Sequence, residues 1–133
     1  MENIVDVIKA LPGLLSLHGA TYEEIDRAEA ALDLHFAEDY EQYLITFGAI
    51  VADGIELTGI AKSAHRNVVN CTKKAQELNP NMHKKCYVLE DTGVDGIVIW
   101  QQSSGSVYAT RPGAAPEKIA GSLSQYIQMR TNG

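Results

Sequence analysis

The sequence predicts a single α+β domain over residues 1–133, in which helices flank an antiparallel meander of strands. Apolar residues recur at helical spacing through the first half of the chain. Short β-branched and aromatic runs, joined by glycine turns, follow between residues 86 and 110. A capping signal near residue 122 then opens a last helix, so the order of elements is typical of an α+β fold.

Residues 1–20 are expected to form a first helix and a loop. Ile4, Val5, Ile8 and Leu11 recur at helical spacing, and Pro12-Gly13 ends this run because proline cannot continue the helical hydrogen bonds. We predict that this helix packs as a flap on the rest of the domain.

The second helix is predicted to open at the capping box Thr21-Tyr-Glu-Glu24, where side chains and backbone N–H groups can bond reciprocally. Ile25, Ala28 and Leu32 then share its apolar face with one acid, Glu29. A buried carboxylate needs a partner, so we expect Glu29 to accept a hydrogen bond from a tyrosine or a backbone N–H.

The third helix is predicted from the apolar spacing of Tyr40, Tyr43, Leu44 and Phe47. Asp39 is its expected N-cap, and Gly48 suits a left-handed stop. Leu34 and Phe36, in the connection before this helix, are expected to reach the core.

The remaining elements follow from turn signals and apolar patterns. A turn at Asp53-Gly54 precedes a strand, a helix ends at Asn79-Pro80, and Trp100 lies in mid-strand, where core packing is favoured over an exposed interface. The predicted elements are a strand over 55–60, a helix over 65–78, strands over 86–90, 97–101 and 106–110, an edge segment near Ile119, and a helix whose capping box is Ser122-Leu-Ser-Gln125.

Acidic residues concentrate on the second and third predicted helices. The formal net charge at pH 7 is −6, while residues 21–42 alone hold eight acids and one base. We predict that Glu23, Asp26, Glu38, Asp39 and Glu41 form an acidic surface. Such a field repels nucleic acid and steers a basic protein partner. The alternative is a solvated helix surface that keeps the protein soluble.

No pattern for export or membrane insertion stands out. The start of the chain has no basic segment before its apolar residues, and no run approaches the roughly 20 apolar residues of a membrane span. Cys71 and Cys86 are then expected to be reduced thiols. We expect a cytoplasmic protein that contacts no membrane.

Patterns for metals and cofactors are also weak. Of His65, Cys71, His83 and Cys86, only the last two have the spacing of a zinc knuckle. The segment at residues 91–96 has two aspartates but lacks the later ligands of a calcium loop, so a hairpin turn is expected there. We predict no cofactor and no metal.

Catalytic and nucleic-acid-binding patterns are missing as well. The chain has no G-x-S-x-G elbow and no glycine-rich phosphate loop. Its basic clusters, Lys73-Lys74 and His83-Lys84-Lys85, are short and lack interleaved aromatic residues. We predict a protein that is not an enzyme and does not bind nucleic acid.

Several sequence motifs, taken in their order along the chain, resemble those of the SUKH superfamily. The first runs Ile25-x3-Glu29-x2-Leu32 and continues as Asp39-Tyr40-x2-Tyr43-Leu44-x2-Phe47-Gly48. The later segments Tyr87-Val-Leu-Glu-Asp91, Gly96-Ile-Val-Ile99, Gly105-Ser-Val-Tyr108 and Ser122-Leu123 resemble that family's strands and closing helix. The resemblance covers residues 21–130, with Asp33 and Phe36-Ala37 where the family has glycine and Leu-Pro.

The resemblance implies a central, mostly antiparallel sheet with helices packed against it. It also implies function, because many bacterial members are immunity proteins that bind a toxin, often a nuclease, while fungal relatives regulate cell-wall synthesis through protein contacts. We therefore expect an immunity protein whose partner is a basic toxin domain. A regulatory protein-interaction module, and a small-molecule-binding domain or enzyme, are the alternatives. The sequence carries no prediction of the oligomeric state.

Overall fold

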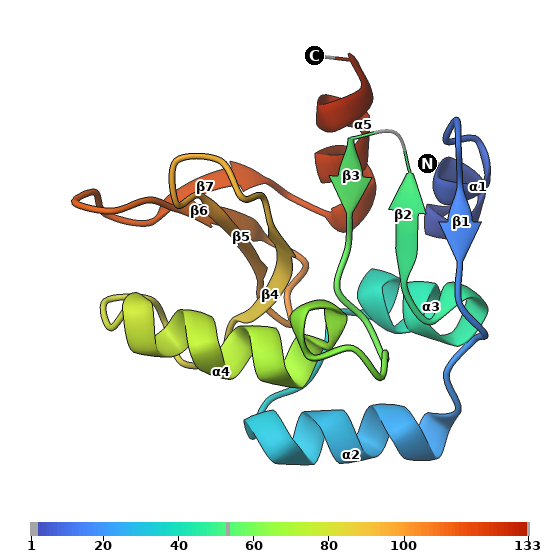
Figure 1. Ribbon diagram of the computed structural model, residues 1–133, viewed down its shortest axis with the longest axis horizontal. Coiled ribbons are helices and arrows are strands. Elements are labelled where there is room, and N and C mark those ends of the chain that lie inside the picture. The colour runs from blue at the N-terminus through green and yellow to red at the C-terminus, as the bar shows by residue number, and fades with distance from the viewer. Residues whose placement is uncertain (1–2, 53, 133) are drawn as a thin grey trace.

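The computed structural model describes residues 3–52 and 54–132 and confirms the α+β class (Figure 1). Asp53 of the predicted turn lies outside the described residues. The elements are α1 (Ile4–Lys9), β1 (Leu15–Ser16), α2 (Tyr22–Leu32), α3 (Glu38–Phe47), β2 (Ile50–Ala52), β3 (Ile55–Glu56), the 3₁₀ helix η1 (Ala64–Arg66), α4 (Val68–Leu78), β4 (Tyr87–Asp91), β5 (Val98–Gln101), β6 (Val107–Thr110), β7 (Glu117–Ala120) and α5 (Leu123–Asn132).

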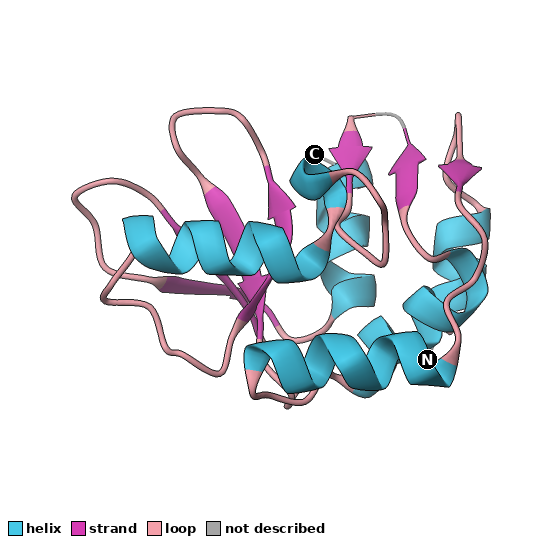
Figure 2. Cartoon of the chain, turned by 60° about the horizontal axis from the view of Figure 1, so that its bottom comes forward, coloured by secondary structure: helices cyan, strands magenta, loops and turns pink. Residues whose placement is uncertain are grey.

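The strands form two antiparallel sheets. The larger sheet has the order β4-β5-β6-β7, and the smaller has the order β1-β2-β3. The predicted meander and the edge segment near Ile119 are therefore confirmed. Figures 1 and 2 show the small sheet beside the large one, where the Thr58 N–H donates to the Leu89 carbonyl at 2.8 Å.

The small sheet departs most from the predicted elements. β1 and β2 have no counterpart among them, and the strand expected over 55–60 is confirmed only at Ile55–Glu56. The physical reason is that two- and three-residue strands depend on partners far away in sequence, such as Leu15 opposite Val51. The Leu57 N–H still donates to the Ile50 carbonyl of β2 at 3.2 Å, but from Thr58 onward the N–H groups bond to partners outside the small sheet.

The helix ends follow capping chemistry, with one error of prediction. Thr21 forms the expected reciprocal capping box with Glu24, with bonds of 2.9 and 3.1 Å. Ser122 Oγ accepts from the Gln125 N–H at 3.1 Å, while Gln125 Oε1 accepts from the Gly121 N–H. Asp39 is not the N-cap of α3, because that position belongs to Ala37, which makes no side-chain cap bond.

The main core lies between α3, α5 and one face of the large sheet. The predicted inward residues of α3 are all buried, as are Leu34 and Phe36 in the preceding connection. α4 covers the opposite face of the sheet, where a second cluster includes Trp100. Trp100 is fully buried and its Nε1–H donates to Thr110 Oγ1 at 2.8 Å, which confirms its predicted place in the core.

Buried tyrosine hydroxyls connect α3 to both sheets. Tyr40 Oη lies 3.0 Å from Thr58 Oγ1, and Tyr43 Oη donates to the Thr58 carbonyl at 2.8 Å. Tyr87 Oη accepts from the Ala37 N–H at 2.9 Å and donates to Gln101 Oε1 at 2.6 Å. Each hydroxyl is therefore satisfied, which removes most of the cost of burying it.

Close backbone contacts fix the turn between α3 and the small sheet. Gly48 ends α3 with a φ of 73° and a ψ of −60°, so its positive φ is as predicted although it is not in the left-handed helical region. Gly59 packs so tightly here that a Cβ atom would lie 1.8 Å from the Gly48 carbonyl oxygen. Only glycine fits at this position without moving backbone.

We predict that Gly59→Ala lowers the free energy of unfolding by about 2 kcal/mol or more, because the added methyl group must displace the backbone of Gly48. Urea unfolding of the purified variant measures this loss. Gly121→Ala is the matched control, since its Cβ would meet only the flexible Gln125 side chain, at 3.3 Å. Equal stability losses in the two variants would contradict the steric explanation.

Candidate protein-binding surface

The amphipathic pattern of α2 and α3 decides which of the predicted acids reach solvent. Because the apolar side chains of both helices face the core, Glu23, Asp26 and Glu38 are exposed, while Glu41 is half-buried. Glu23 forms an exposed i,i+4 ion pair of 3.0 Å with Arg27, and such pairs add little to stability.

Asp39 faces inward and serves the fold. Its Oδ1 accepts from Gln101 Nε2 at 3.1 Å, and its Oδ2 accepts from the Leu123 N–H at 2.8 Å. The carboxylate thus caps the first turn of α5, where the helix dipole also favours negative charge. The structure therefore removes Asp39 from the freely exposed part of the predicted acidic surface.

Glu29 also has the structural role expected of it. It is half-buried on α2, and its Oε2 accepts from the Phe36 N–H at 2.8 Å. The bond holds the connection between α2 and α3, which places Phe36 in the aromatic core.

Two surface hollows meet beside the exposed acids. The first has a volume of about 420 Å³ and is lined by Asp26 and Glu29 of α2, by Asp33 at the end of that helix, and by Lys85. The second, of about 390 Å³, is lined by Glu38 and Asp39, with no lysine or arginine in its described lining. Ser103 lines both hollows, so they adjoin, and we call them together the acidic hollows.

The five predicted acids are thus only partly brought together. Asp26 and Glu38 border the acidic hollows as freely exposed carboxylates, whereas Glu23 and Glu41 lie outside the described linings. Asp33, which was not among the predicted residues, lies 3.3 Å from Lys85 Nζ in an exposed pair. Its i+7 spacing from Asp26 was the signal that could have found it. This arrangement can attract and hold cationic side chains.

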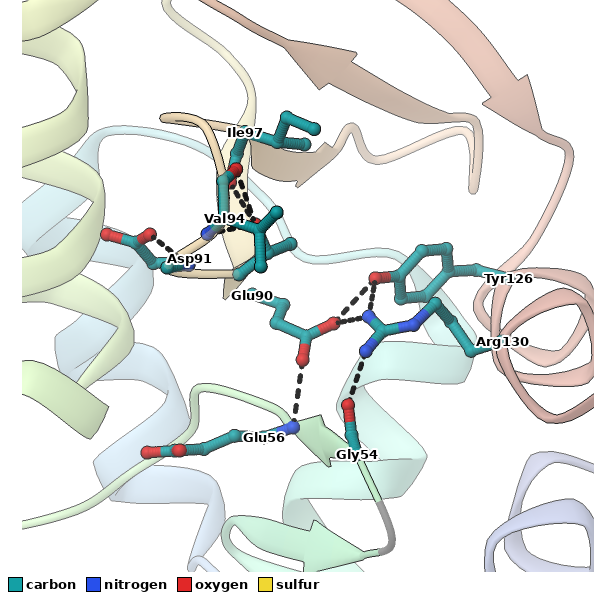
Figure 3. Close-up of polar contacts among 10 residues, drawn as sticks. Gly54, Glu56, Glu90, Asp91, Val94, Ile97, Tyr126 and Arg130 are labelled. Carbon is teal, nitrogen blue, oxygen red and sulfur yellow. Dashed lines mark hydrogen bonds and ion pairs between the residues drawn. The ribbon is translucent and has the colours of Figure 1, made fainter. Parts of the chain in front are cut away.

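Apart from the acidic hollows, a cluster of hydrogen-bonded polar side chains around Glu90 holds α5 against both sheets (Figure 3). Glu90 is 3% exposed, and its carboxylate accepts from the Glu56 N–H at 2.9 Å and from Tyr126 Oη at 2.6 Å. Arg130 forms an ion pair with the same carboxylate and donates to the Gly54 carbonyl. The carboxylate thus joins β3, β4 and α5.

The cluster changes the pKa values of its members. Burial raises the pKa of Tyr126 above its ordinary value, and the neighbouring Glu90 carboxylate raises it further. Burial is the largest single influence and lowers the pKa of Arg130, but the Glu90 carboxylate and Tyr126 together outweigh it, so the net direction is upward. The sequence pattern did not reveal this cluster, because Glu90 and Arg130 lie 40 residues apart and no local pattern pairs them.

The thiols and histidines do not assemble into a metal site among the described residues. No group of three or more His, Cys, Asp or Glu side chains there is placed to hold a metal ion. Cys86 is buried and Cys71 half-buried, and both are free. Burial raises the pKa of the Cys86 thiol to about 11. Burial, and then the Asp91 carboxylate, also raise the pKa of Cys71.

Comparison with known protein families finds a match over nearly the whole chain. A family model described as SUKH_5, SMI1-KNR4 cell-wall, matches residues 1–131. No curated protein matches the chain.

We predict that Glu90→Gln lowers the free energy of unfolding by about 2 kcal/mol, because the amide cannot replace a carboxylate that faces Arg130 and accepts three hydrogen bonds. The control is Glu117→Gln, at an exposed position on β7. Urea unfolding should separate the two variants. A double-mutant cycle with Arg130→Met should return a coupling energy of about 1 kcal/mol or more, and additive effects would contradict the ion pair.

We also predict that Cys86 resists thiol reagents in the folded protein at pH 8, because it is buried and its pKa lies near 11. Labelling of Cys71→Ala with Ellman's reagent measures Cys86 alone, and Cys86→Ala reports on Cys71, which should react more slowly than free cysteine. The Cys86 thiol ionises more readily in the unfolded chain, so the free energy of unfolding should fall as the pH rises from 9.0 to about 11. Rapid labelling of Cys86 without unfolding would contradict this.

Proposed function

This chain belongs to the SUKH superfamily, through the SMI1-KNR4 cell-wall family, and from this premise we propose that it is an immunity protein that binds and neutralises a bacterial toxin by direct contact. The partner is a toxin domain with a basic surface, such as a nuclease, and the contact forms in the bacterial cytoplasm. No catalytic step is asked of the chain. None of the described helices is long and apolar enough to cross a membrane.

The observation that carries the proposal is the pair of acidic hollows. Of the five acids in their described linings, Asp26 and Glu38 are the freely exposed ones, and the described lining of the second hollow has no lysine or arginine. Concave sites with one sign of charge focus the electrostatic field and raise the association rate of an oppositely charged partner. A nuclease carries positive charge to hold phosphate groups, so an acidic surface competes for the same site.

The name of the family supports a second candidate function. Because this name refers to the cell wall, the alternative is a regulatory module that binds a protein other than a toxin. The two candidates differ in gene context, since an immunity gene is expected directly beside the gene of its toxin. An isolated gene would favour the regulatory module.

The test begins with capture of the partner from the native strain by the tagged, folded chain. We expect a one-to-one complex with a basic protein whose toxicity to bacterial cells is abolished by co-expression of this chain. A captured partner that is not toxic, or that stays toxic when co-expressed, would overturn the immunity function.

We predict that reversing Asp26 and Glu38 to lysine slows association with that partner about tenfold at low ionic strength, because both carboxylates border the acidic hollows. The matched control reverses Glu77 and Glu117, which are exposed elsewhere and change the net charge equally. Stopped-flow measurements should show that the difference shrinks at high salt. Equal association rates for the two double variants would exclude the acidic hollows as the steering surface.

A further inference from the structure

One sheet edge in the described part of the chain is both open and apolar. The two sheets have four edge strands, β1, β3, β4 and β7. The edge at β3 faces β4, because the Thr58 N–H donates to the Leu89 carbonyl and the Glu56 N–H donates to the Glu90 carboxylate. β7 exposes Glu117 and Lys118, and charges of this kind protect an edge from pairing. β1 has no comparable protection.

The backbone of β1 leaves groups available for pairing. Figures 1 and 2 show β1 as the outermost strand of the small sheet. The Leu17 N–H donates to the Ala49 carbonyl at 3.0 Å. Backbone groups of successive residues alternate between the partner strand and the other side, so the N–H and C=O of Ser16 face the open edge.

Apolar side chains accompany this edge. Leu15 is 71% exposed and Leu17 is 45% exposed, and both lie on the same face of the strand because they are two residues apart. Leu15 stands opposite the half-buried Val51. A solvent-facing leucine pair on a short edge strand does not stabilise the isolated domain, and it fits the apolar side chains of an added strand.

A large groove begins at Ser16 and Leu17 of this segment. It lies between residues 16–20 and 60–66 and has a volume of about 960 Å³, and we call it the β1 groove. Ala61, a small residue at its wall, leaves room for another backbone. On the other wall, Gly19 packs against the Ile45 carbonyl oxygen, where a Cβ atom would lie at 2.0 Å, so this wall lies directly against α3.

The charges of the groove select the chemistry of its occupant. Lys62 and Arg66 line it, against Glu24, whose carboxylate accepts from the Thr21 N–H in the capping box. The formal charge of this lining is positive, whereas four other hollows of this chain have negative linings. Arg66 is held by the Ile50 carbonyl and Glu56, while Lys62 is exposed and makes no ion pair with the described residues.

We propose that the β1 edge and the β1 groove bind an extended segment of another protein in which an apolar residue neighbours a carboxylate. The segment adds a strand beside Ser16, places its apolar side chain against Leu17, and directs its carboxylate to Lys62. A second copy of this chain fits less well, because its own β1 segment, Leu14-Leu-Ser-Leu17, brings no acid to Lys62. This surface does not share a described lining residue with the acidic hollows.

The test selects phage-displayed random heptapeptides on the immobilised wild-type protein, and calorimetry then measures the affinity of the most enriched peptide as a synthetic copy. We expect enriched peptides to combine β-branched or aromatic residues with Asp or Glu. Leu17→Glu and Lys62→Glu should each weaken binding at least tenfold. The control Lys118→Glu, on the β7 edge, makes the same charge change as Lys62→Glu and should leave the affinity within twofold.

Three results would overturn the proposal: no enriched peptide, enrichment of basic peptides, or equal binding by wild type and Leu17→Glu. Sedimentation velocity adds a fourth, since a wild-type dimer that Leu17→Glu dissociates would assign this edge to a second copy. Reversal of Asp26 and Glu38 should not change peptide binding, so failure here and failure of the immunity function are distinguishable.

Discussion

The structure depends on the burial of three tyrosine hydroxyls. Tyr40, Tyr43 and Tyr87 lie in one aromatic cluster with Phe36, and a buried hydroxyl without a partner would cost several kcal/mol. Their hydrogen bonds reach Thr58, Gln101 and the backbone of Ala37. Thr58 lies in the link between the two sheets, Gln101 lies in the large sheet, and Ala37 lies at the start of α3. The hydrogen bonds of the tyrosine hydroxyls therefore fix the positions of these three parts relative to one another.

Two carboxylates perform the same task for the last helix. Asp39 accepts from the first N–H group of α5, and Glu90 binds Arg130 near the other end of that helix. Both acids lie where a charge would be unfavourable without its partners, so the position of α5 follows from electrostatics as well as from its apolar face. Part of the chain's acidity therefore stabilises the fold and is not available to attract another protein.

The surface that remains divides into regions of different chemistry. The acidic hollows lie beside α2 and α3, and Asp26 and Glu38 reach solvent there because the apolar faces of these helices turn inward. The β1 edge differs from the acidic hollows, because it combines open backbone groups and exposed leucines with the positively charged Lys62. The described residues thus offer one surface suited to steering by charge and another suited to strand addition.

Local patterns in the sequence were enough to determine the helices, the meander and the inward face of α3. The Thr21 capping box, the apolar spacing from Tyr40 to Phe47 and the glycine turns each involve residues close in sequence, so a single chain reveals them. Only the tertiary structure determined the role of Asp39, the pairing of Glu90 with Arg130 and the existence of the strand β1. Their partners lie tens of residues away, at Leu123, Arg130 and Val51, and no local pattern specifies a contact over such a separation.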